Sequence, residues 1–129
     1  MAKTVDELLV YQKARDAAAN ISKLLERFGL ARDRVLADQL NKGSVRVLSD
    51  IAEGFEQKTD KGFAKYLYDA KGGAQELRTQ LDVALTRKHI SVTESEGLRS
   101  AYLEIAKMLG GLISYLETEN RSHRRRPER

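Results

Sequence analysis

The sequence contains no cysteine, no tryptophan and only a single proline. Without cysteine the chain can form no disulfide, offers no thiolate nucleophile and cannot build a cysteine-ligated zinc or iron–sulfur site. The amino-terminal stretch MAKTVDELLVYQKARD carries charges throughout, and it holds no apolar run long enough for a signal peptide or a membrane span. These absences exclude disulfide and thiol chemistry, and we interpret the protein as cytoplasmic.

The composition that remains is that of a soluble, helix-rich protein. Of the 129 residues, 41% are hydrophobic and 33% are charged, and the net charge is +4. The final segment, RSHRRRPER, holds five of the 23 Lys and Arg residues and one of the 19 Asp and Glu residues, which leaves 18 of each sign before it. We therefore predict one domain over residues 1–120 and an Arg-rich, disordered tail over residues 121–129.

Apolar residues recur every three or four positions in four segments, which is the period of an amphipathic helix. This spacing predicts helices over residues 5–28, 34–57, about 63–88 and about 92–120, the first and last of them preceded by capping boxes at Thr4–Glu7 and Ser91–Glu94. No segment alternates with a period of two for long enough to form a strand. Because the connections are short, the predicted fold is all-α, an antiparallel up-and-down four-helix bundle.

Two of the predicted helices carry surfaces that a plain bundle does not need. In the helix over residues 34–57, polar residues gather opposite the apolar stripe. The helix over residues 63–88 contains two adjacent glycines, each costing about 1 kcal/mol relative to alanine, and close helix packing within the bundle or against another copy would explain them. We predict a subunit interface here, with a solvated face as the alternative. Its candidates are Lys42, Arg46, Ser49, Asp50, Glu53, Gly72, Gly73 and Glu76.

Patterns that indicate an enzyme are missing from the sequence. A di-iron bundle requires Glu-x-x-His motifs, and neither of the two histidines, His89 and His123, follows a glutamate at that spacing. No phosphate-binding P-loop is present, and no His or Lys is placed by the sequence to activate Ser44 or Ser49 as a nucleophile. We therefore predict a protein without catalytic residues, metal ligands or a cofactor.

Three stretches resemble a known family: DELLVYQKARDAAANI near the start, LADQLNKGSVRVLSDIAEGFEQ from residue 36, and KGFAKYLYDAKGGAQELRTQLDVA from residue 61. Together they are similar to the 23S rRNA intervening-sequence proteins. The resemblance implies a four-helix bundle that assembles into a homopentameric ring, in a family whose members mostly lack an assigned activity. Related proteins are accessory factors of diversity-generating retroelements that bind nucleic acid. The family has Asn where this chain has Asp50, and often Pro where it has Leu48.

Two hypotheses of function follow, and they are compatible with each other. The first is a non-enzymatic homopentameric scaffold whose partner is a further copy of the chain. The second is an accessory protein that binds the phosphate backbone of RNA or DNA through the tail, although the tail could equally be a frayed terminus. Base stacking has little support, because Phe28 and the two other phenylalanines fall on core stripes. The tail candidates are Arg121, Arg124, Arg125 and Arg126.

Overall fold

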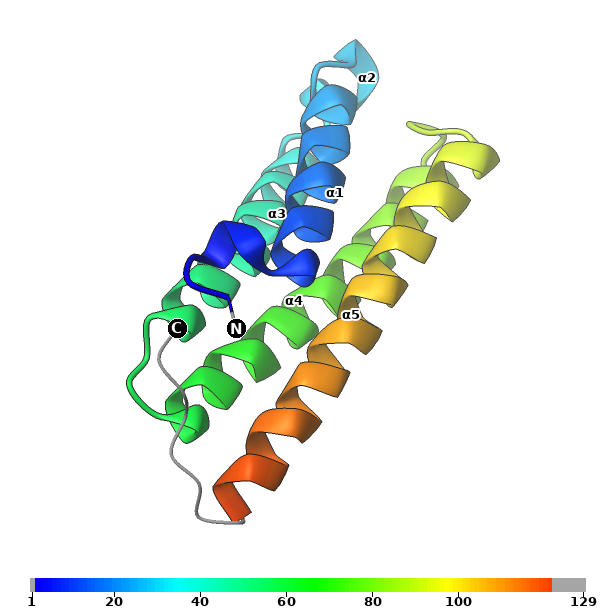
Figure 1. The fold of residues 1–129 in the computed structure, drawn as a ribbon. Coiled ribbons are helices and arrows are strands. Elements are labelled where there is room, and N and C mark those ends of the chain that lie inside the picture. The colour runs from blue at the N-terminus through cyan, green and yellow to red at the C-terminus, as the bar shows by residue number, and fades with distance from the viewer. Residues whose placement is uncertain (1, 122–129) are drawn as a thin grey trace.

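The computed structural model describes residues 2–121 of the chain (Figure 1). In this part of the chain it contains a 3₁₀ helix and five α-helices, and no strand: η1 (Val5–Glu7), α1 (Leu9–Leu25), α2 (Phe28–Arg32), α3 (Arg34–Phe55), α4 (Asp60–Thr86) and α5 (Val92–Arg121). The predicted all-α class is confirmed. None of the described helices is both long enough and apolar enough to cross a membrane.

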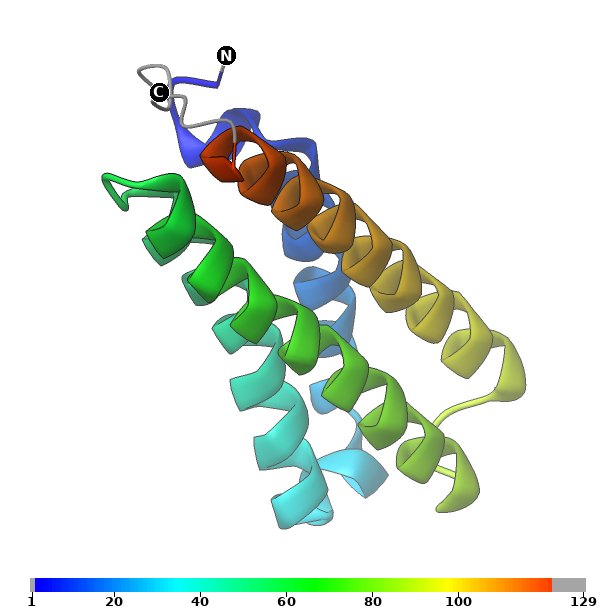
Figure 2. The ribbon, with the colours of Figure 1, turned by 90° about the horizontal axis from the view of Figure 1, so that it is seen from below.

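The four long helices α1, α3, α4 and α5 surround one core, and successive long helices run in opposite directions (Figure 1). In Figure 2, α4 lies between α3 and α5, and α1 lies on the far side. Side-chain contacts agree that α3 and α4 are antiparallel, since Gly43 faces Leu77 whereas Gly54, further along α3, faces Phe63, near the start of α4. The short helix α2 closes the end of the bundle where α3 begins.

The start of the chain differs from the helix predicted over residues 5–28. Glu7 accepts hydrogen bonds from the backbone N–H groups of Lys3 and Thr4, at 2.6 Å and 2.8 Å, so the predicted capping box is present. This capping box begins only the short helix η1. Leu8 is extended, with φ −76° and ψ 123°, and α1 begins after Leu8. Arg27 is extended as well and separates α1 from α2.

This second break changes which residue of the segment enters the core. Phe28, predicted on the core stripe, is 76% exposed, and the placement was wrong. The extended backbone at Arg27 rotates the following residues relative to α1, so Leu30 points inward and is fully buried. The Phe28 ring instead contacts the Arg32 guanidinium, whose carbon lies 5.2 Å from the ring centroid.

The other helix ends follow local signals in the sequence. Thr59 accepts a hydrogen bond from the N–H of Gly62 at 3.0 Å and caps α4, while α3 ends at Phe55. The second capping box is reciprocal: Ser91 Oγ accepts from the N–H of Glu94, and the Glu94 carboxylate accepts from the N–H of Ser91. Lys88, in the turn that ends α4, has a positive φ of 64°.

Candidate subunit interface

Four of the predicted interface residues form an exposed row on α3. Lys42, Arg46, Ser49 and Glu53 recur every three or four positions and are all exposed. Lys42 pairs with Asp38 at 3.0 Å on the same helix. Such exposed pairs contribute little to stability.

Asp50 is the member of the set whose environment is unusual. Its side chain is only 16% exposed, and its Oδ2 lies 3.6 Å from Arg46 Nε, beyond hydrogen-bonding distance. No donor among the described residues satisfies this oxygen. Burial raises the pKa of Asp50 above its ordinary value; Arg46 opposes the shift, and the carboxylate of Asp69 on α4 adds to it.

The two adjacent glycines of α4 lie on different sides of the helix. A Cβ at Gly72 would meet nothing within 4 Å, so this backbone is open to an approaching surface. Gly73 is buried, and a Cβ there would lie 3.2 Å from Val47 on α3. Gly73 therefore serves the packing of α3 on α4 and is corrected from an interface candidate to a bundle residue. Glu76 is exposed.

We use the name α3–α4 face for the residues that remain exposed: Lys42, Arg46, Ser49, Glu53, Gly72 and Glu76. The structure adds two apolar side chains on the exposed side of α3 that sequence reasoning missed, Val35 at 71% and Val45 at 54% exposure. Both valines fall outside the apolar stripe of the helix, and this position in the sequence could have identified them as exposed. Single exposed apolar side chains are common on protein surfaces, so these two valines alone do not identify an interface.

The predicted RNA-binding arginines lie at or beyond the end of α5. Arg121 is the last residue of α5, so the tail predicted from residue 121 is helical at its first position. Arg124, Arg125 and Arg126 lie outside the described residues. Beside the last turns of α5 is a pocket of about 640 Å³, bounded by the start of α4 and by Leu116 and Glu117.

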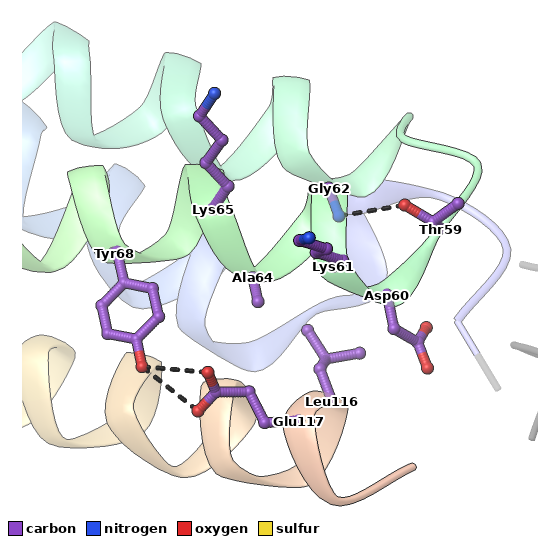
Figure 3. Close-up of a pocket in the computed structure, with 9 residues that line it drawn as sticks. All are labelled: Thr59, Asp60, Lys61, Gly62, Ala64, Lys65, Tyr68, Leu116 and Glu117. Carbon is purple, nitrogen blue, oxygen red and sulfur yellow. Dashed lines mark hydrogen bonds between the residues drawn. The ribbon is translucent and has the colours of Figure 1, made fainter. Parts of the chain in front are cut away.

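Figure 3 shows how this pocket is built. Ala64 and Leu116 supply apolar surface between the helices. Tyr68, which is 51% exposed, crosses from α4 to α5, and its hydroxyl donates to the Glu117 carboxylate at 3.1 Å. This hydrogen bond raises the pKa of Tyr68. Lys65 extends away from the Tyr68–Glu117 pair in the figure.

At the opposite end of the bundle, two carboxylates join the helix connections. The Asp33 carboxylate receives hydrogen bonds from His89 Nε2 and Arg87 Nη1, each at 2.9 Å, and these hold the pKa of Asp33 below its usual value. The paired carboxylate and guanidinium of Glu94 and Arg27 join α5 to the end of α1, and the pKa of Glu94 falls to about 2. His89 thus has a partner that its sequence position did not predict.

The described residues hold no cluster of three or more His, Cys, Asp or Glu side chains that could bind a metal ion. The fold defines a class, the all-α helical-bundle proteins. Within this class, the chain belongs to the 23S rRNA-intervening sequence proteins, because the model of that family matches residues 6–111. The resemblance drawn from the sequence is confirmed.

A solved structure gives the same fold. It is a protein of unknown function from the S23 ribosomal protein family of Bacteroides thetaiotaomicron VPI-5482, and it superposes with a TM-score of 0.76. The similarity covers 82% of this chain and 96% of that one, at 20% sequence identity, and at this identity it shows the fold alone. No functionally curated protein matches the chain.

Proposed function

We propose that the protein is a non-enzymatic, cytoplasmic scaffold that assembles into a homopentameric ring through its α3–α4 face. The observation that carries this proposal is Asp50, a largely buried carboxylate at the edge of that face; one of its oxygens lies 3.6 Å from Arg46 Nε and accepts no hydrogen bond from the described residues. A buried polar group without a partner costs about 1–3 kcal/mol. A donor supplied by a neighbouring copy would remove this cost, so assembly and stability would be coupled at Asp50.

The neighbouring residues support the same surface. Val45 would lose its contact with water on assembly, and Gly72 lets a side chain of the neighbour approach the α4 backbone. A ring with an odd number of subunits cannot be closed by a two-fold contact, so the α3–α4 face must meet a different face of the next copy. The interface is therefore heterologous. Each contact in the ring contains one α3–α4 face, so a single disruptive substitution on this face alters one side of every contact.

Substitutions on the α3–α4 face test the proposal. Ser49→Arg places a long charged side chain at the centre of the exposed row of α3, and we expect the ring to dissociate or lose subunits in light scattering. Asn20→Arg is the matched control, because Asn20 is exposed on α1, away from this face. Unchanged mass in both variants would refute the interface; loss of mass in both would place Asn20 in the complementary face or show a general effect of charge.

A second candidate function is favoured by the location of the charge. The folded domain is neutral by count, and the excess of +4 lies in residues 121–129. On a ring, five tails would bring about +20 to one assembly, and several weak phosphate contacts would act together. We propose RNA binding through Arg121, Arg124, Arg125 and Arg126 as the accessory function of the scaffold.

Truncation after Asn120 tests this second function. Among the side chains that the structure describes, Leu116 is the last buried core residue, so truncation after Asn120 keeps every described core residue. We expect fluorescence anisotropy to show RNA binding with a steep salt dependence for the full chain and much weaker binding for the truncated one. A full-length control with the tail arginines replaced by lysine keeps the charge and should keep most of the binding. Equal affinities of the full and truncated chains would exclude the tail as the binding element.

A further inference from the structure

Neither proposed function uses the pocket between the start of α4 and the last turns of α5. Its volume is about 640 Å³, and its lining combines carboxylates, an aromatic ring and apolar surface. Asp60 and Glu117 supply the carboxylates, and Tyr68 supplies the ring (Figure 3). This combination suits the side chain of an arginine, whose guanidinium pairs with a carboxylate and stacks on an aromatic ring while its stem covers apolar surface.

Glu117 is held in position for such a contact by the neighbouring helix. The Tyr68 hydroxyl lies 3.1 Å and 3.2 Å from the two oxygens of its carboxylate, which fixes the carboxylate beside the ring. A carboxylate has about four lone-pair sites, so one hydroxyl donor leaves Glu117 able to accept further hydrogen bonds. The ring of Tyr68 also remains accessible, because the residue is 51% exposed.

Two lysines line the same pocket, but their charges are less fixed than those of the carboxylates. Lys61 and Lys65 are exposed, and Lys65 extends away from the Tyr68–Glu117 pair in Figure 3. A lysine carries its charge on a four-carbon stem, so the ammonium group can turn out into water. Asp60 is buried and Glu117 is held by Tyr68. We therefore expect the pocket to take a cation.

We propose that this pocket binds an arginine side chain of the chain's own carboxyl-terminal segment, residues 122–129. This segment lies outside the described residues, and its sequence SHRRRPER contains four arginines and one glutamate. It follows Arg121, the last residue of α5, which is about one helical turn beyond Glu117. An extended chain covers about 3.3 Å per residue, so Arg124 and Arg126 can reach about 10–17 Å from the end of α5. That length is sufficient to return to the pocket.

Covalent attachment allows a weak contact of this kind to be well populated. A segment joined directly to the helix that lines the pocket has an effective concentration in the millimolar range. The contact requires neither the ring nor RNA, so it goes beyond both proposed functions. It also has a regulatory consequence, because an arginine that occupies the pocket is not available to any ligand of the segment outside the chain.

Trypsin cleavage of the full chain after Arg124 and Arg125 tests this inference, because an arginine bound in the pocket cannot enter the active site of the protease. Protection is the cleavage rate of the free peptide RSHRRRPER divided by the rate in the chain, both followed by mass spectrometry. At low salt we expect protection of about fivefold to tenfold. Glu117→Gln and Tyr68→Ala should each lower it to less than about twofold, because each removes one of the contacts that hold the guanidinium.

The matched control is Glu96→Gln, which makes the same change at an exposed position near the other end of α5 and should leave protection unchanged. A thermal melt of each variant shows whether the bundle is intact. If Tyr68→Ala unfolds, Glu117→Gln still decides the result, because a glutamine can accept the Tyr68 hydroxyl hydrogen bond. Cleavage of the unsubstituted chain as fast as the free peptide would overturn the proposal, as would equal loss of protection in Glu96→Gln and Glu117→Gln.

Two further variants identify what occupies the pocket. R124K/R125K/R126K/R129K keeps the charge but removes the paired N–H donors of the guanidinium, so protection relative to its own free peptide should fall below about twofold. Lys65→Gln removes a positive charge from the lining and should keep or raise protection. A loss of protection in Lys65→Gln would show that the pocket holds an anion, such as the Glu128 carboxylate, and would overturn the proposal. Protection that falls on dilution would place the segment on another copy and would overturn it as well.

Discussion

Two glycine-to-alanine substitutions, one buried and one exposed, measure how closely α3 and α4 pack. Gly111 lies on the exposed side of α5 with nothing within 4 Å of a Cβ, so Gly111→Ala should gain about 1 kcal/mol from helix propensity. At Gly54 the added Cβ would lie 2.9 Å from Tyr66 Cβ and 3.2 Å from the Phe63 carbonyl oxygen. Neither is the end of a flexible side chain, so α3 and α4 must separate, at a cost of about 1–3 kcal/mol.

The assay is urea unfolding followed by helical circular dichroism, with a thermal melt of the same samples. Because both glycines are helical and share the propensity gain, we expect Gly54→Ala to lie about 1–3 kcal/mol below Gly111→Ala in free energy of unfolding, roughly 4–12 °C apart in Tm for a chain of this size. Equal stability of the two variants would refute the close approach of α3 and α4 at Gly54. Greater stability of Gly54→Ala would refute it more strongly.

Gly72→Ala connects this experiment to assembly. In one chain the substitution meets open space and should gain as much as Gly111→Ala. On a ring that uses the α3–α4 face, the added methyl group meets the neighbouring subunit, and we expect the apparent stability to become more dependent on protein concentration. Gly111→Ala, outside that face, should show no such change. Identical concentration dependence of the two variants would remove Gly72 from the interface.

Further predictions concern buried and paired polar groups. The folded pKa of Glu94 is about 2, below its ordinary 4.5, so its contribution to stability is present above pH 4.5 and is lost as the pH falls toward 2; Glu94→Gln should flatten the acid limb of a stability profile over this window. The pKa of Asp50 is raised, so its ionised form destabilises the fold, and Asp50→Asn should raise the Tm of the dissociated subunit at neutral pH but not at pH 3. The Tyr102 hydroxyl is buried without a partner among the described residues, and Tyr102→Phe should stabilise the protein by about 1 kcal/mol in urea unfolding.

The long helices could be predicted from the sequence because their signals are local. Apolar spacing located α3, α4 and α5, and the capping residue Ser91 marked where α5 begins. The prediction of the first helix was wrong because it relied on the same local signals. Its apolar spacing continues through Leu8 and Arg27, and only the extended backbone at these two residues reveals the breaks.

The site was predictable in part. A helical wheel placed Ser49 and its neighbours on an exposed face, but it could not rank the burial of Asp50, which depends on the distance between α3 and α4. It treated Gly72 and Gly73 as one feature, whereas a rotation of one residue puts the first in solvent and the second against Val47.

The central claim is that the α3–α4 face joins copies of the chain into a closed ring of five. Native mass spectrometry at micromolar concentration tests it most directly, since it counts the chains in each assembly. The account predicts one dominant species with five times the 14.5 kDa mass of a single chain, and its loss in the Ser49→Arg variant. A single chain of 14.5 kDa, or a dimer built on a two-fold contact, would contradict it.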